Sequence, residues 1–74
     1  MYTVVIADDE KIECISMKLL LTNNFPEIHV AAIVSNGIEL VQVISQFHPY
    51  IALVDVNMPG MSGLEAIEIL RAKG

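Results

Sequence analysis

Positive charge is scarce in this sequence, whose 74 residues include 4 Lys or Arg against 9 Asp or Glu and carry a net charge of −5. A surface that binds nucleic acid needs clustered basic side chains to neutralise the phosphates. The composition therefore excludes direct nucleic-acid contact by this segment, and any contact with DNA would have to come from another domain.

Long hydrophobic runs are absent as well. A helix that spans a bilayer needs about 20 consecutive apolar residues, and no uninterrupted stretch approaches that length. The N-terminus lacks a basic region, and Asp8 interrupts its first apolar run, which excludes a secretory signal. We expect no membrane contact and a cytoplasmic protein.

Cysteine is limited to Cys14, which cannot form a disulfide within the chain. It lies in an apolar helical pattern, and we expect it to be a small core residue rather than a reactive thiol. Apolar residues, in contrast, make up 54% of the sequence, and the mean hydropathy is +0.58. These values are high for so short a chain and indicate a piece of a larger core.

Three apolar runs predict β-strands: Thr3–Ala7, His29–Val34 and Ile51–Val56. Their nearly continuous apolar character is typical of strands covered on both faces. The segments between and after them have helical spacing, so the predicted order is β-α-β-α-β-α with right-handed crossovers. The predicted fold class is α/β, with a parallel three-stranded sheet and flanking helices formed by residues 1–74.

Polar residues mark the helix ends. Asn36 with Glu39, and Ser62 with Glu65, have the spacing of capping boxes for the second and third helices. Gly74 lies where a C-cap glycine belongs. We expect the following side chains to face inward: Leu40, Val41, Ile44 and Phe47 in the second helix, and Leu64, Ile67 and Leu70 in the third.

Acids follow two of the predicted strands. Asp8 and Asp9 come after the first strand, and Asp55 ends the apolar run Ile51–Val54. Ligands bind at this end of the strands in open α/β sheets. If the two strands are neighbours, carboxylates about 5 Å apart repel by about 3 kcal/mol at an effective dielectric near 20. A hard divalent cation, Mg²⁺ above all, is the simplest relief.

Each acid also has a structural interpretation. Asp8 and Asp9 could cap the first helix, where the helix dipole favours a negative charge by about 0.3–1 kcal/mol. Asp55 is harder to explain in this way, because a carboxylate at the end of a buried strand is costly unless it is paired or bound to a metal.

The segment before the last helix is predicted to be a sharp turn. Pro59 fixes φ and Gly60 permits a positive φ, while Gly63 permits a close approach of the backbone. Met58 and Met61 are expected to pack in the interior, because Mg²⁺ prefers oxygen ligands.

The acid pair, Asp55 and the following loop Val56-Asn57-Met58-Pro59-Gly60-Met61-Ser62-Gly63 together resemble the receiver domain of two-component response regulators. The resemblance runs from Tyr2 to the end of the sequence. It implies the strand order 2-1-3 and a truncated flavodoxin-like receiver fold. The later strands of the family, which carry a lysine and a hydroxyl residue that contact the phosphoryl group, are absent from this sequence.

For function, the resemblance implies that Asp55 accepts a phosphoryl group from a sensor histidine kinase. It implies a Mg²⁺ ion held by Asp9 directly, by Asp8 partly through water, by Asp55 and by the backbone carbonyl of Asn57. A receiver domain is a signalling switch rather than an enzyme, although it assists its own phosphorylation.

Two other functions stay open. Without the later lysine and hydroxyl residue, the chain could be a protein-interaction or assembly module. The second alternative is a Mg²⁺-dependent phosphatase with Asp55 as nucleophile, but haloacid-dehalogenase-like enzymes usually carry a second acid where this chain has Asn57.

His29 and His48 are expected at the N-terminal ends of the second and third strands, far from Asp55. We therefore do not expect either histidine to be a phosphohistidine donor.

The third strand lies at an edge in the order 2-1-3, and it has no proline or charge before Asp55. An edge of this kind is a template for another strand, and uncovered apolar patches beyond a few hundred Å² usually find a partner. We expect a homodimer with two-fold symmetry, formed through a strand or by exchange of the last helix.

Overall fold

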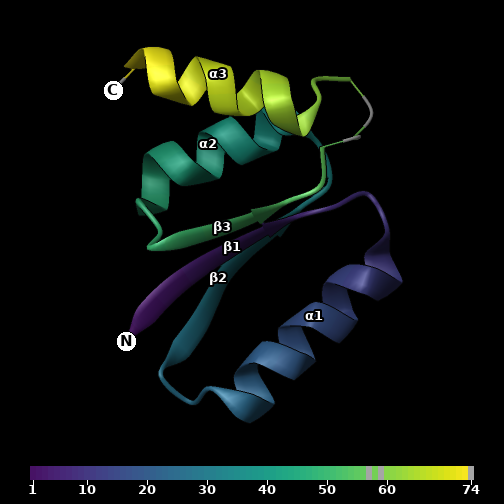
Figure 1. Ribbon diagram of the computed structural model, residues 1–74, viewed down its shortest axis with the longest axis vertical. Helices are drawn as coiled ribbons and strands as arrows, with labels where there is room; N and C mark the ends of the chain where they lie inside the picture. The colour runs from purple at the N-terminus through teal and green to yellow at the C-terminus, as the bar shows by residue number, and fades with distance from the viewer. Residues whose placement is uncertain (57, 59, 74) are drawn as a thin grey trace.

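The computed structural model describes residues 1–56, 58 and 60–73. Its sheet is built from three parallel strands: β1 (Tyr2–Ala7), β2 (Ile28–Val34) and β3 (Ile51–Val54). The strand order is β2-β1-β3, which confirms the predicted topology (Figure 1). The third strand is shorter than predicted: β3 ends at Val54, opposite Ala7, which is the last residue of β1.

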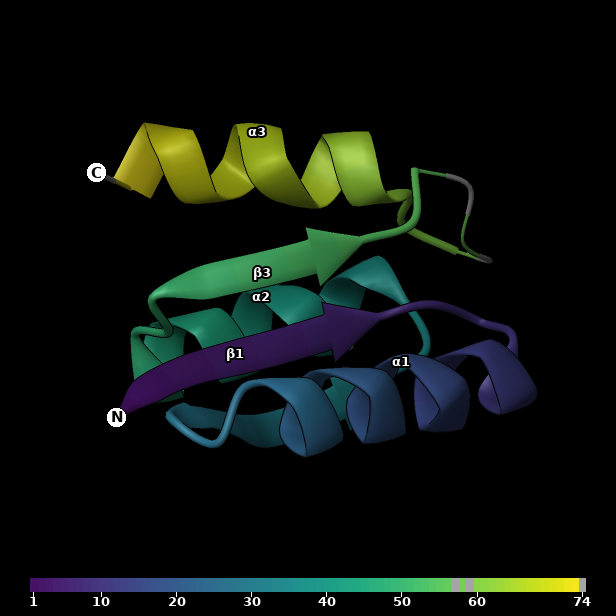
Figure 2. The same ribbon diagram turned by 60° about the horizontal axis from the view of Figure 1, so that its bottom comes forward.

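Three helices complete the fold: α1 (Lys11–Asn24), α2 (Gly37–Phe47) and α3 (Gly63–Lys73). Figure 2 shows α1 on one face of the sheet and α2 on the other, and α3 lies beside α2. Helices thus lie on both faces of the sheet, as the alternating pattern predicts. None of the described helices has the length and apolar character needed to cross a membrane.

The central strand β1 is buried on both faces, and its last four residues are at most 3% exposed. Successive side chains of a strand point to opposite faces. Two apolar clusters result: Val5, Ala7, Val34, Leu40, Met58 and Ala66 on the side of α2 and α3, and Val4, Ile6 and Cys14 on the side of α1. The prediction that Cys14 is a core residue is confirmed, since it is 2% exposed.

Side chains cap α2 and α3 as predicted. The Asn36 side chain accepts a hydrogen bond from the Glu39 amide (2.9 Å). The Ser62 hydroxyl accepts one from the Glu65 amide (3.2 Å), and the Glu65 carboxylate accepts one from the Ser62 amide (3.2 Å). Both helices therefore begin where the sequence places their caps. The predicted C-cap, Gly74, lies outside the described residues.

The helices bury a narrower apolar face than predicted. Most of the predicted inward side chains are at least partly buried, but Phe47 is 43% and Leu64 is 58% exposed. The prediction is wrong for these two residues. In α3 Ala66 is fully buried, and its small side chain allows the helix to lie close to its neighbours.

Apolar surface is exposed beside the edge strand β3. Ile51 is 43% exposed, and on α1 the exposed fractions are 78% for Ile12 and 59% for Leu20. The self-association expected from this edge strand stays a prediction, and these exposed apolar side chains are the surface on which it would depend.

We therefore expect the mass measured by light scattering to rise from that of a monomer toward that of a dimer as concentration increases. Ala52→Lys, at an exposed position of β3, should weaken this association, because charge on an edge strand opposes pairing. Ala72→Lys, at an exposed position of α3, is the matched control. A folded monomer at every concentration up to about 1 mM would contradict the prediction.

Candidate functional site

The ends of β1 and β3 bring the predicted acids together. The Asp55 amide donates a hydrogen bond to the Ala7 carbonyl (2.8 Å), and the Asp8 amide donates one to the Val34 carbonyl (3.0 Å). Parallel pairing thus continues one residue past the ends of the strands. The backbone of both acids is held by the sheet rather than by a free loop.

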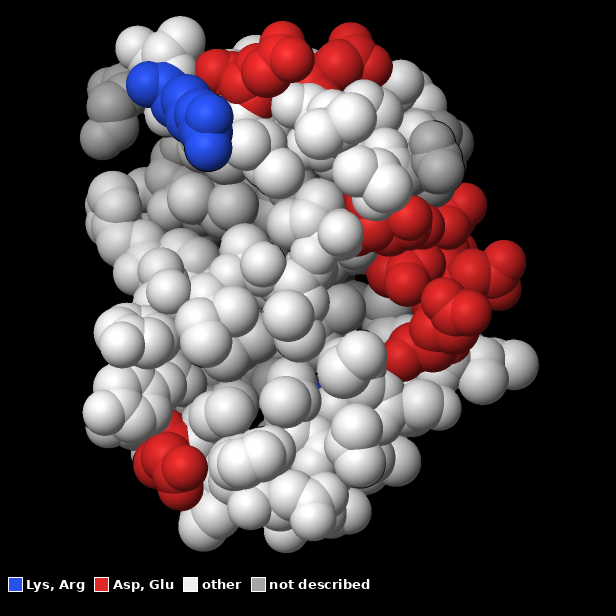
Figure 3. All heavy atoms as spheres, in the orientation of Figure 1, with Lys and Arg blue, Asp and Glu red and all other residues white. Residues whose placement is uncertain are grey.

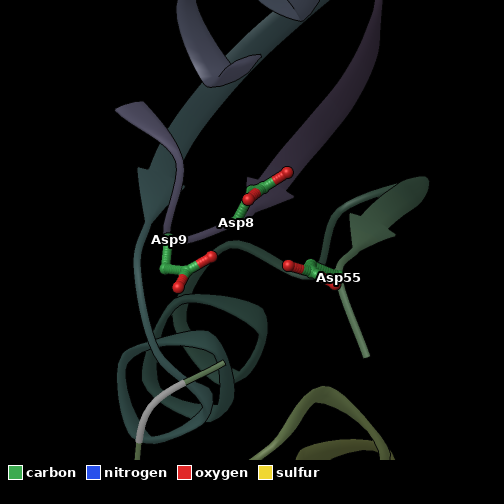
Figure 4. Close-up of side chains that lie close together, drawn as sticks. All are labelled: Asp8, Asp9 and Asp55. Carbon is green, nitrogen blue, oxygen red and sulfur yellow. The ribbon is translucent and has the colours of Figure 1, made fainter. Parts of the chain in front are cut away.

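Asp8, Asp9 and Asp55 form one carboxylate cluster, which we call the acid triad. One carboxylate oxygen from each residue lies within 4.8 Å of the other two. Figure 4 shows Asp9 and Asp55 pointing toward each other, with Asp8 beside them at the end of β1. Asp8 and Asp55 are partly buried and Asp9 is exposed. The predicted convergence of these side chains is confirmed.

Neither Asp8 nor Asp9 is the N-cap of α1. The N-cap residue is Glu10, and its own side chain makes no capping hydrogen bond. Asp8 instead accepts a hydrogen bond from the Glu10 amide (2.9 Å), which turns the chain from β1 into α1. The capping interpretation is therefore wrong in detail, although Asp8 does shape the start of the helix.

Electrostatic repulsion makes the acid triad costly without a counterion. Two unit charges 4.8 Å apart repel by between about 1 and 3 kcal/mol as the effective dielectric falls from that of water to about 20. Each of the three residues offers a carboxylate oxygen, and oxygen ligands suit a hard divalent cation such as Mg²⁺. The nearby Cys14 thiol does not compete as a ligand, because burial and then the charge of Asp8 raise its pKa.

Glu13 is a further acid at this site, and it was not predicted from the sequence. It lies in the first turn of α1 and lines the same groove as Asp8 and Asp55. A hydrogen bond between the side chains of Glu13 and Asp8 raises the pKa of Glu13, and the negative charges of Asp8, Glu10 and Asp55 act in the same direction. Figure 3 shows a patch of acidic side chains at the right edge of a largely uncharged front face, with further acidic side chains at the top and at the lower left.

Gly63 lets the start of α3 lie directly against the end of β3. A methyl group at this position would overlap the carbonyl oxygen of Asp55 and would approach Val54 Cγ1 to 2.7 Å. The close backbone approach predicted for Gly63 is therefore confirmed. Gly37 has the corresponding role in α2, where its amide donates a hydrogen bond to the Met61 carbonyl (3.0 Å).

The loop between β3 and α3 has a turn at Gly60 and packs its methionines inward. Gly60 has a φ of 72°, which confirms the predicted turn at that residue. Met58 is buried and Met61 packs against the same cluster, as predicted. Asn57 and Pro59 lie outside the described residues, so the proposed carbonyl ligand of Asn57 stays a prediction.

His29 and His48 lie at the end of the sheet opposite the acid triad. His29 is the second residue of β2, and His48 is the C-cap of α2 shortly before β3 begins. Both are exposed. Their positions agree with the expectation that neither histidine takes part in chemistry at Asp55.

The chain is similar to known proteins over nearly its whole length. Residues 4–74 match the response regulator receiver domain family. The nitrate/nitrite response regulator protein NarL of Escherichia coli (strain K12) is 35% identical over 71 residues, which are 96% of this chain and 32% of that protein. A protein-glutamate methylesterase/protein-glutamine glutaminase of Methanosarcina mazei is 34% identical over 70 residues, which are 95% of this chain and 19% of that protein.

Solved structures show the same fold. The response regulator domain of CheB from Thermotoga maritima matches with a TM-score of 0.92 at 23% identity, over 100% of this chain and 55% of its own. A DNA-binding response regulator of the LuxR family from Staphylococcus aureus matches with a TM-score of 0.90 at 27% identity, over 99% of this chain and 60% of its own. This chain thus spans less than two thirds of each relative and each solved structure.

Proposed function

The chain belongs to the response regulator receiver domain family, and on this premise we propose that Asp55 accepts a phosphoryl group from a sensor histidine kinase with the help of Mg²⁺. The observation that carries the proposal is the convergence of three carboxylates within 4.8 Å at the ends of β1 and β3. Receiver domains partner with histidine kinases and are typically phosphoacceptors rather than enzymes.

In the proposed reaction Asp55 is the nucleophile. One of its carboxylate oxygens forms a bond to phosphorus while the bond from phosphorus to the histidine nitrogen of the kinase breaks, and the electron pair of that bond goes to the nitrogen. Phosphoryl transfer depends mainly on positioning and on neutralising charge. The hydrogen bond from the Asp55 amide to the Ala7 carbonyl supports the positioning, because it holds the backbone of the nucleophile on the sheet.

The acid triad fits the Mg²⁺ ion that this chemistry requires. Asp9, Asp8 and Asp55 offer carboxylate oxygens, and we propose the carbonyl of Asn57 as a fourth ligand. Bound Mg²⁺ would offset the repulsion between the Asp55 carboxylate and the anionic phosphoryl group. Asp8 already accepts a hydrogen bond from the Glu10 amide. We therefore propose that Asp8 contacts the Mg²⁺ ion partly through water.

The setting of this activity also belongs to the proposal. The net charge of −5 argues against DNA contact by this segment, so a DNA-binding output would be the task of another domain. A cytoplasmic location stays a prediction.

The alternative function, a protein-interaction module, is favoured by the exposed apolar surface along β3 and α1. Metal binding distinguishes the two functions, since an interaction module need not retain a cation site.

Calorimetric titration with Mg²⁺ is the experiment for this proposal. The wild type should bind weakly, and Asp9→Ala should lose at least about tenfold in affinity, because loss of even an outer partner of a metal site costs that much. Glu68→Ala, which removes an exposed acid from α3, is the matched control and should bind like the wild type. Equal binding by the wild type and Asp9→Ala would refute the proposed site.

A further inference from the structure

Glu13 approaches the acid triad from the helix α1, whereas the triad itself comes from the ends of strands. A groove of about 760 Å³ runs along α1 beside β1 and β3. Its charged lining residues are Asp8, Glu13 and Asp55, and the rest of its lining is apolar apart from Ser16. Glu13 therefore faces the same space as two members of the triad.

The position of Glu13 follows from the local fold. The Asp8 carboxylate accepts a hydrogen bond from the Glu10 amide, and the Cys14 thiol donates one to the Asp8 carbonyl (3.3 Å). These contacts hold the first turn of α1 against the end of β1. Glu13 lies in that turn, next to Cys14, and lines the groove together with Asp8 and Asp55.

Glu13 does not belong to the inner cluster, because the oxygens that lie within 4.8 Å of one another come from Asp8, Asp9 and Asp55. Its side chain is exposed, so water has access to it. An exposed carboxylate at this range suits contact with the water shell of a cation rather than with the cation itself, since Mg²⁺ usually keeps several of its waters.

We propose that Glu13 is an outer carboxylate of the cation site, which accepts hydrogen bonds from water on the bound ion at the mouth of the α1 groove. The inference rests on the proposed function, because it concerns the same Mg²⁺ ion. The helix α1 would thereby contribute directly to the affinity of the site for the cation. In this role Glu13 is a positioning residue for the hydrated ion.

The test compares two variants that remove one negative charge each from the same end of the molecule. Glu13→Gln removes the proposed contact. Glu10→Gln is the matched control, because Glu10 lies in the same turn of chain but does not line the groove. Both residues are exposed, and thermal unfolding monitored by circular dichroism should show that both variants fold like the wild type.

Calorimetric titration with Mg²⁺, repeated with Mn²⁺, should give an affinity about three- to tenfold lower for Glu13→Gln than for the wild type. Removing an outer partner of a metal site usually lowers the affinity by about tenfold or more. We expect a loss at or below that value, because solvent screens the charge of an exposed side chain. Glu10→Gln should change the affinity by less than about twofold, as expected for a screened surface charge.

Equal losses in the two variants would overturn the inference, because net charge alone would then explain the effect. Wild-type affinity in Glu13→Gln would overturn it as well. A wild type that binds neither metal would instead refute the proposed function, so the two failures are distinguishable. Glu13→Asp provides a second check: it keeps the charge on a shorter side chain and should retain more affinity than Glu13→Gln.

Discussion

Replacing Gly63 with alanine is expected to lower the free energy of unfolding by about 3 kcal/mol, the upper end of the usual cost of overpacking. The added methyl group would overlap the backbone carbonyl oxygen of Asp55 and press on Val54. Neither neighbour can move easily, because the Asp55 amide is hydrogen-bonded to Ala7 in the sheet. Relief would require α3 to shift away from the end of β3.

Gly60→Ala is the matched control for this experiment. Gly60 has a φ of +72° but no atom within 4 Å of the added methyl group, so its cost is limited to backbone strain of about 1 kcal/mol. Urea denaturation of the two variants measures the difference. Helix propensity alone predicts that Gly63→Ala is stabilising by up to about 1 kcal/mol, and a stabilising result would contradict the close packing described for α3.

The position of the acid triad could be predicted from the sequence because it depends on local pattern and on one topological fact. Apolar runs end directly before Asp8 and Asp55, and the carboxyl ends of parallel strands meet at one edge of the sheet. The resemblance supplied the order 2-1-3, which makes the two strands neighbours. The helix caps at Asn36 and Ser62 were predictable for a similar reason, since each depends on residues only three positions apart.

Other features depend on tertiary packing that periodicity does not specify. Phe47 and Leu64 have the spacing of buried residues, yet the described elements leave both side chains exposed. Glu13 looks like an ordinary solvated residue until α1 is placed against β1. A signal was present, because Glu13 lies only four residues after Asp9, but its meaning depends on the orientation of the helix.

The second large effect concerns Asp55 as phosphoryl acceptor. Incubation with a small acyl phosphate and Mg²⁺ should add one phosphoryl group, and we expect Asp55→Ala to abolish this label, because it removes the nucleophilic carboxylate. Labelling of residues 1–74 should be slow, since the lysine and hydroxyl residue that the family uses to contact the phosphoryl group are not in this sequence. Asp9→Ala should reduce the label through loss of Mg²⁺.

The central claim is tested most directly by locating that label. Borohydride reduction of the acyl phosphate, followed by mass spectrometry of peptides, identifies the modified residue. We predict a single modified residue, Asp55, that requires Mg²⁺ and disappears when the metal is chelated. A phosphoryl group on any other residue, or undiminished labelling of Asp55→Ala, would contradict the assignment of this acid triad as a phosphoacceptor site.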